Sequence, residues 1–163
     1  MFEKKDCVVT SALGVCVVAD VPKLAVGKEQ QMQYYLLRAL QDKNKKSYIP
    51  VENHQTVIRF PMEAEEARDI LDKLLNGGSE FLEKEEAEKM PLLSCGKEWL
   101  ASTNPLEWAK ATVYLLRNSS VLDQELREDL EKAWRNLSQE LAYVLEKEQE
   151  EIRQQVENTV KYS

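Results

Sequence analysis

The hydrophobic periodicity of the chain changes at Pro61, and this change constrains the fold more than any other sequence feature. Before Pro61, apolar residues alternate with polar ones or form short β-branched runs, which is typical of strands. After it, apolar residues recur every three or four positions, as they do in amphipathic helices. A chain of 163 residues with one such boundary is long enough for two small domains. The sequence therefore predicts an α+β protein in which strands come first and helices follow.

Residues 1–60 contain short apolar segments that turn signals separate. Gly14 comes before the second segment, Gly27 before the third, and Pro50 ends the fourth. Because closing short strands on themselves removes exposed edges, we predict a small antiparallel β-barrel of the SH3 or Tudor type. The expected strands cover residues 7–9, 15–21, 32–40, 46–49 and 56–60. Alternation along the third strand places Tyr34, Leu36 and Arg38 on one face, with Tyr35, Leu37 and Ala39 on the other.

The rest of the chain is expected to be largely helical. A helix over residues 64–75 would end at Gly77-Gly78, because glycine favours the C-terminal end of a helix. Asn104 followed by Pro105 marks another helix start, since asparagine caps helices and proline is tolerated at the first position. The predicted domains are the barrel over residues 1–60, acidic connecting helices and a hinge over residues 61–96, and an all-α helical bundle domain over residues 97–163.

The charge of the chain changes sign near the same boundary. Residues 1–60 hold nine Lys and Arg against six Asp and Glu, a net charge of +3. Residues 61–163 hold thirteen against twenty-three, a net charge of −10. Proteins that bind nucleic acid unaided usually present a broad basic face, and this composition does not favour one. Any contact with DNA is therefore expected to be local or to depend on a partner.

The few cysteines and the single histidine predict neither a metal centre nor an enzyme. Cys7, Cys16 and Cys95 form no Cys-x-x-Cys pair, and His54 lies in no catalytic pattern. Motifs that bind phosphates or dinucleotides are absent from the sequence. No apolar run approaches the roughly 20 residues that cross a bilayer, and no signal peptide is recognised. We expect a cytoplasmic, non-enzymatic protein with reduced thiols and no cofactor.

Ordered sequence segments along nearly the whole chain resemble the CarD/CdnL family of bacterial regulators that bind RNA polymerase. In the first sixty residues, the matching segments are Phe2-x-x-x-Asp6-x-Val8-Val9, Gly14-Val15, Gly27-x-Glu29-x-x-x-x-Tyr34-Tyr35-x-Leu37-Arg38, Ile49-Pro50-Val51-x-Asn53 and Arg59. In the helical part, they are Trp99-Leu100-Ala101-Ser102 and Leu130-x-x-Ala133-x-x-x-Leu137-x-x-Glu140-Leu141-Ala142-x-Val144-Leu145.

The resemblance implies a fold and a function without chemistry. A barrel of this family docks on the β subunit of RNA polymerase, and its helical domain lies over promoter DNA at the upstream edge of the melted region. Members stabilise the open promoter complex. This chain departs from the family where Thr10 to Gly14 lacks the usual Pro and His, and where Tyr48 replaces a basic residue. Met90-Pro91 stands where the family has a tryptophan that wedges into DNA.

The candidate site residues fall into two groups. The expected polymerase-binding residues are Lys23, Tyr35, Arg38, Lys45, Lys46 and Tyr48, because tyrosine and arginine are favoured anchors at protein interfaces. The expected DNA-binding residues are Met90, Lys97, Trp99, Lys110 and Arg117. For both groups a structural interpretation stays open, in which the aromatic rings pack in the core and the charges are solvated.

The leading functional hypothesis is a transcription regulator that binds the RNA polymerase β subunit and modulates the stability of the open promoter complex. It expects promoter DNA to be bound weakly, and only in the polymerase complex. A second hypothesis is an adaptor that binds polymerase or another factor without wedging into DNA. A third is a Tudor-like protein that binds RNA or a peptide and has no connection with polymerase.

Overall fold

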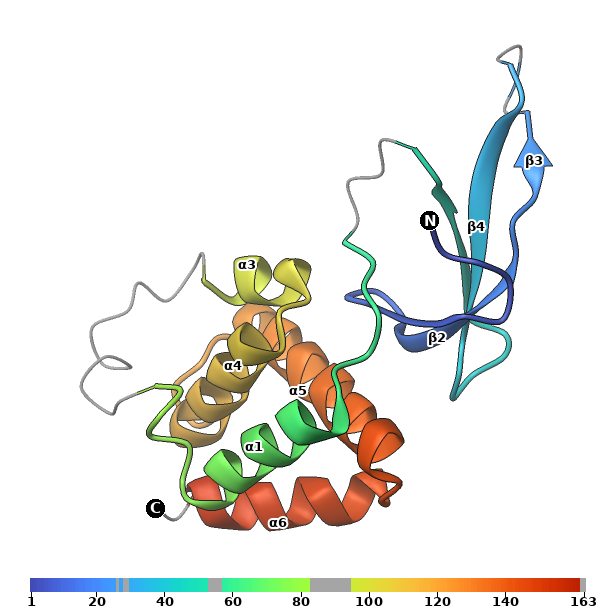
Figure 1. Cartoon of the computed structure of the whole chain (residues 1–163). Helices are drawn as coiled ribbons and strands as arrows, with labels where there is room; N and C mark the ends of the chain where they lie inside the picture. The colour runs from blue at the N-terminus through green and yellow to red at the C-terminus, as the bar shows by residue number, and fades with distance from the viewer. Residues whose placement is uncertain (26, 28–29, 53–56, 83–94, 162–163) are drawn as a thin grey trace. The chain divides into compact units, whose positions relative to one another are not determined.

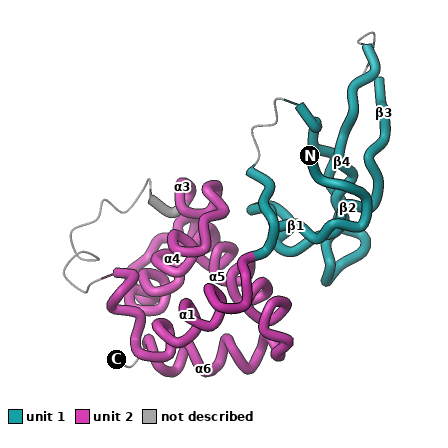
Figure 2. Tube along the Cα trace, in the orientation of Figure 1, with its two compact units in different colours: residues 1–61 teal, residues 62–163 magenta. Residues whose placement is uncertain are grey.

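The computed structural model describes residues 1–25, 27, 30–52, 57–82 and 95–161. These residues divide into two compact units, Met1–Pro61 and Met62–Ser163, which Figure 2 shows in different colours. We call them the sheet unit and the helical unit. The predicted α+β class, with an antiparallel sheet followed by helices, is confirmed.

The sheet unit is built around its longest strand, β4 (Met32–Ala39). β1 (Cys7–Thr10) pairs with β2 (Gly14–Asp20), which pairs with β4. The two-residue β3 (Lys23–Leu24) and β5 (Lys46–Pro50) also pair with β4, and all four pairings are antiparallel. Gly14 has a φ of 67° at the turn between β1 and β2, a conformation that glycine adopts at little cost.

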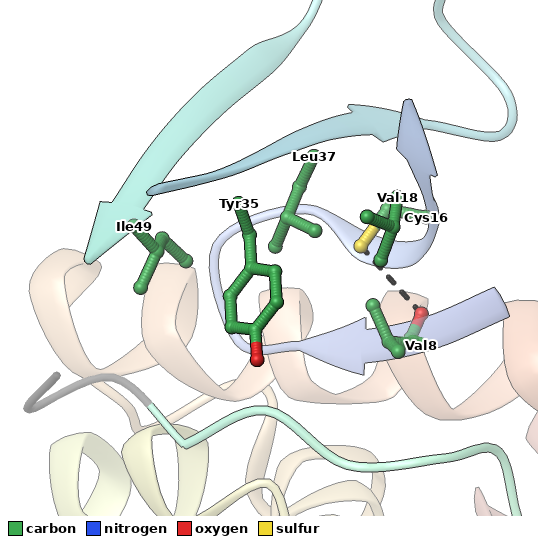
Figure 3. Packing of buried hydrophobic residues seen from close by; sticks show 6 residues of the cluster. All are labelled: Val8, Cys16, Val18, Tyr35, Leu37 and Ile49. Carbon is green, nitrogen blue, oxygen red and sulfur yellow. Dashed lines mark hydrogen bonds between the residues drawn. The ribbon is translucent and has the colours of Figure 1, made fainter. Parts of the chain in front are cut away.

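One face of this sheet carries the core of the unit. Alternation along the strands directs Val8, Cys16, Val18, Tyr35, Leu37 and Ile49 toward the same interior (Figure 3). The Tyr35 hydroxyl accepts a hydrogen bond of 3.1 Å from the backbone N–H of Phe2, which fixes the start of the chain on this core. Burial raises the pKa of the Cys16 thiol to about 12, so this thiol stays protonated and contributes to packing at neutral pH.

The sheet does not close into the barrel that the sequence predicted. Of the last predicted strand, residue 56 lies outside the described residues, and residues 57–60 contribute a single bridge. In it, Val9 and Arg59 exchange two backbone hydrogen bonds of 2.7 and 3.2 Å. Two physical reasons limit this pairing: β1 has only four residues, and Pro61 has no N–H to extend a ladder.

The helical unit surrounds its longest helix, α5 (Gln124–Leu145), which contacts the other four described helices (Figure 1). They are α1 (Ala64–Leu75), α3 (Cys95–Ser102), α4 (Pro105–Asn118) and α6 (Gln149–Lys161). Its core includes two fully buried tryptophans, Trp108 and Trp134. None of the described helices combines the length and the apolar composition that crossing a membrane requires.

Local sequence explains where several of these helices begin and end. The Asn104 side chain accepts a hydrogen bond from the N–H of Leu106, as predicted for the start of α4. α1 spans the residues predicted for it and is followed by Gly77 and Gly78, both with positive φ. A Cβ atom on Gly78 would lie 2.5 Å from Val113, so glycine also permits close packing there.

The segment between the predicted domains is only partly described. α1 contacts α4, α5 and α6, so the first helix after Pro61 belongs to the helical unit. Residues 83–94, which belong to the segment predicted as acidic connecting helices and a hinge, lie outside the described residues.

Candidate functional site

The outer side of β4 and β5 gathers basic and aromatic side chains on one surface. We call it the β4–β5 face and define it by Tyr34, Leu36, Arg38, Lys46 and Tyr48. Arg38, Lys46 and Tyr48 are exposed, whereas Tyr34 and Leu36 are partly buried. These residues alternate with core residues along both strands, so the pleat of the sheet holds all five on the side away from the core.

The register of the hairpin sets two residue pairs of this face side by side. Arg38 lies opposite Lys46, and Leu36 lies opposite Tyr48. Backbone hydrogen bonds join Ala39 to Lys45, so the neighbouring pair Arg38 and Lys46 occupies a position without backbone hydrogen bonds between them. Side chains are closest at such positions. Two positive charges and one tyrosine hydroxyl are therefore concentrated on a small area.

The backbone of β5 adds hydrogen-bonding groups beside this face. In the described part of the chain, β5 pairs only with β4. Hydrogen-bonded positions alternate along an antiparallel pair, so the N–H and C=O groups of Lys46 and Tyr48 point away from β4. Pro50 ends this row because it has no N–H. The outer edge of β5 therefore offers an extended partner both backbone groups and side chains.

The remaining lysines of the predicted polymerase-binding group, Lys45 and Lys23, lie outside this face. Lys45 is exposed at the start of the β5 side of the hairpin, and alternation directs its side chain to the opposite side from Lys46. Lys23 is exposed on β3. It lines an open hollow of about 440 Å³ together with Met1, Gln31, Met32, Gln33, Val51 and Glu52.

Tyr35 does not belong to the exposed surface. Its side chain is only 2 % exposed and packs edge-on against Phe2, with ring centroids 5.6 Å apart. A partner could not reach this ring without opening the core. The burial of Tyr35 therefore does not support its proposed binding role, and it favours the core interpretation, which the sequence left open.

The alternation of the sequence indicated which residues, in place of Tyr35, share the exposed face with Arg38. Tyr34 and Leu36 share a face with Arg38 by two-residue alternation, but neither was predicted as a site residue. Val17 lies opposite Arg38 on β2 and is partly buried, so it extends this surface toward the centre of the sheet. Residue type favours either tyrosine as an interface anchor. Only the alternation of the strand shows that Tyr34 faces outward and Tyr35 faces the core.

Trp99, predicted as a DNA-binding residue, is part of the helical core. Its side chain is 8 % exposed, and its ring packs edge-on against Tyr114 with centroids 6.1 Å apart. This places a ring of α3 against a ring of α4. The binding role proposed for Trp99 is therefore not supported by its burial, and Met90 lies outside the described residues.

Arg117 is occupied by the fold of the helical unit. Its guanidinium donates hydrogen bonds of 2.8 Å to the carbonyl oxygens of Gly77 and Leu82, and a third of 3.2 Å to the Ser79 hydroxyl. These contacts fasten the turn after α1 to the C-terminal end of α4. Arg117 therefore has a structural role that its place in the sequence did not reveal.

Lys97 and Lys110 remain nearer to solvent. The Lys97 ammonium lies 2.8 Å from a Glu125 carboxylate oxygen, and both side chains are largely exposed. A hydrogen bond to Glu125, together with its negative charge, raises the pKa of Lys97. Lys110 is partly buried on α4. An exposed ion pair contributes little stability, so Lys97 can exchange Glu125 for another anion at small cost.

The chemistry of the β4–β5 face is that of recognition. Arginine and lysine bind carboxylates and phosphates through charge-assisted hydrogen bonds, while Leu36 and the rings of Tyr34 and Tyr48 offer apolar contact area. Among the described residues, no three His, Cys, Asp or Glu side chains come together as a metal site requires. The face is therefore suited to a partner that combines acidic and apolar groups.

The chain was also compared with known proteins. No protein-family model and no curated protein sequence matches it. The resemblance to the CarD/CdnL family therefore stays a hypothesis.

Proposed function

We propose that this protein is a regulator of transcription initiation that binds the β subunit of RNA polymerase through its β4–β5 face. In this proposal, the sheet unit is a variant of the SH3- or Tudor-like module whose sheet stays open. The resemblance of its strand segments to the CarD/CdnL family supports the choice of partner. The helical unit is the part that adjusts the open promoter complex.

The observation that carries the proposal is the pairing of Arg38 with Lys46. Like charges directly opposite each other on neighbouring strands destabilise a sheet. The two side chains are exposed and lie opposite each other across a position without backbone hydrogen bonds. A carboxylate placed between them would relieve the repulsion and gain charge-assisted hydrogen bonds. Such a pair favours binding to an acidic partner over stability of the isolated fold.

A second candidate function is an adaptor that binds polymerase without wedging into DNA. The burial of Trp99 and the internal hydrogen bonds of Arg117 favour it. Both side chains would have to leave the fold to reach DNA. In this form of the proposal, the helical unit acts through protein contacts or through weak phosphate contacts of Lys97 and Lys110.

Binding of the full-length chain to purified RNA polymerase core enzyme, measured by interferometry, tests the proposal. Arg38→Glu together with Lys46→Glu is expected to weaken binding at least tenfold, since each reversal turns an attraction into a repulsion. The matched control is Lys4→Glu together with Arg135→Glu, which changes the net charge equally at exposed positions outside the face. It is expected to bind like the native chain.

The other possible outcomes separate the hypotheses. Equal losses in both double variants would indicate non-specific attraction and would contradict the proposed face. Binding of single-stranded RNA but not of polymerase would contradict the proposal in favour of a nucleic-acid-binding sheet. With polymerase binding intact, a longer lifetime of the open promoter complex supports the first candidate function, and an unchanged lifetime supports the adaptor.

A further inference from the structure

The chain between the two units is held on both sides by hydrogen bonds. On the side of the sheet unit, Arg59 is fixed to β1 through its two backbone hydrogen bonds with Val9. On the side of the helical unit, the N–H of Met62 donates a hydrogen bond of 2.7 Å to Oε2 of Glu140 on α5. Only Phe60 and Pro61 lie between these two fixed positions.

The anchor in the helical unit is buried. The Glu140 side chain is fully buried and the Met62 side chain is 7 % exposed. A buried hydrogen bond is costly to lose, because neither its donor nor its acceptor can turn to water instead. Met62 therefore belongs to the fold of the helical unit by both its backbone and its side chain.

The two residues between the anchors have few torsions left. The Phe60 ring packs edge-on against Phe2 at 5.0 Å, and its carbonyl oxygen accepts a hydrogen bond of 3.1 Å from Arg59 Nη1. A residue before proline is restricted to extended conformations. Pro61 itself has a fixed φ. The ψ torsion of Pro61 is the least restrained torsion between the anchors.

We infer that motion between the two units is confined to a pivot formed by Phe60 and Pro61, and that Glu140 is the positioning residue that keeps this pivot short. A short, stiff connection limits the volume that one unit can explore relative to the other. When a partner binds one unit, the other unit would then be held near that partner at a high effective concentration. This inference does not depend on the identity of that partner.

Amide exchange and ¹⁵N relaxation of the full-length chain test the inference. In the native chain, the Met62 amide is expected to exchange slowly, and both units are expected to share one rotational correlation time. Glu140→Ala removes the acceptor, so exchange at Met62 is expected to accelerate about tenfold, which corresponds to the loss of one buried hydrogen bond. Glu140→Gln retains an acceptor oxygen and is expected to protect the amide.

A second variant keeps the test independent of whether Glu140→Ala folds. Inserting Gly-Ser-Gly-Ser between Pro61 and Met62 leaves both anchors in place and lengthens the connection. The two units are then expected to show separate, shorter correlation times. The inference is overturned if the native chain already shows separate times, if the insertion leaves one shared time, or if Met62 exchanges equally fast with and without the Glu140 acceptor.

Discussion

Apart from the buried Tyr35, the candidate binding residues of the sheet unit are exposed, whereas two of those in the helical unit hold that unit together. Arg38 and Lys46 are exposed side by side on the β4–β5 face. Arg117 instead donates to backbone carbonyls, and Trp99 is buried against Tyr114. Residue type alone therefore does not define a binding site. A side chain can bind a partner only if it is neither buried in the core nor engaged in hydrogen bonds within the fold.

The difference follows from the geometry of the two kinds of structure. A sheet that packs on one face must direct every second side chain outward, and no other element of its unit is required to cover that face. A helix in a bundle lies among several neighbours, and α4 contacts α1, α3, α5 and α6. A long cation near the end of such a helix readily meets carbonyl groups of an adjoining turn. Arg117 does so at Gly77 and Leu82.

The largest expected effect comes from Trp99→Ala. Removing a buried tryptophan side chain is expected to lower the free energy of unfolding by about 3–5 kcal/mol. The corresponding change on the β4–β5 face, Tyr48→Ala, is expected to cost less than about 1 kcal/mol, because it loses only a cross-strand contact. Denaturation in urea measures both. A stability of Trp99→Ala within about 0.5 kcal/mol of the native value would instead show that Trp99 is exposed.

Arg117→Met is expected to have the next largest effect. The apolar stem is kept, but the Gly77 and Leu82 carbonyl oxygens lose a charged donor, which is expected to cost about 1.5–3 kcal/mol. Arg117→Lys cannot reproduce the fork of hydrogen bonds and is expected to fall between the two. Arg135→Met, at an exposed position of α5, is the matched control and is expected to change stability by less than about 0.5 kcal/mol. Native stability of Arg117→Met combined with weaker promoter binding would restore the DNA-binding role.

The smallest expected effect is a stabilisation, so its sign is opposite to that of the other two. Arg38→Glu turns a repulsive cross-strand pair with Lys46 into an attractive one, which is expected to stabilise the isolated protein by about 0.2–1 kcal/mol. Lys46→Glu is expected to do the same. The double variant restores like charges and is expected to return to the native value. Destabilisation by both single variants in urea at low salt would show that the pair is not the repulsive contact that the register implies.

The sequence predicted local features well and long-range ones poorly. The alternation of Tyr34, Leu36 and Arg38, the cap at Asn104 and the end of α1 depend on neighbouring residues, and each is confirmed. The pairing of Arg38 with Lys46 depends on the register of the hairpin, which alternation alone does not fix.

Contacts between distant segments account for the rest. The carbonyl partners of Arg117 lie 35 and 40 residues away in the chain, and Met62 meets Glu140 across 78 residues. The sheet stays open because the outer edge of β1 pairs with a single residue of the last predicted strand, Arg59. The periodicity of the sequence does not predict these contacts, because they form only when each unit folds.

Hydrogen–deuterium exchange of the full-length chain with and without RNA polymerase core enzyme shows whether the β4–β5 face is the surface that binds the polymerase. New protection is expected in β5, above all at the Lys46 and Tyr48 amides, which point away from β4. Backbone amides of β4 near Arg38 are expected to become protected together with those of β5. The double variant Arg38→Glu and Lys46→Glu is expected to abolish both changes. Protection confined to the helical unit, or no protection in β5 at polymerase concentrations that bind the chain, would contradict the β4–β5 face as the binding surface.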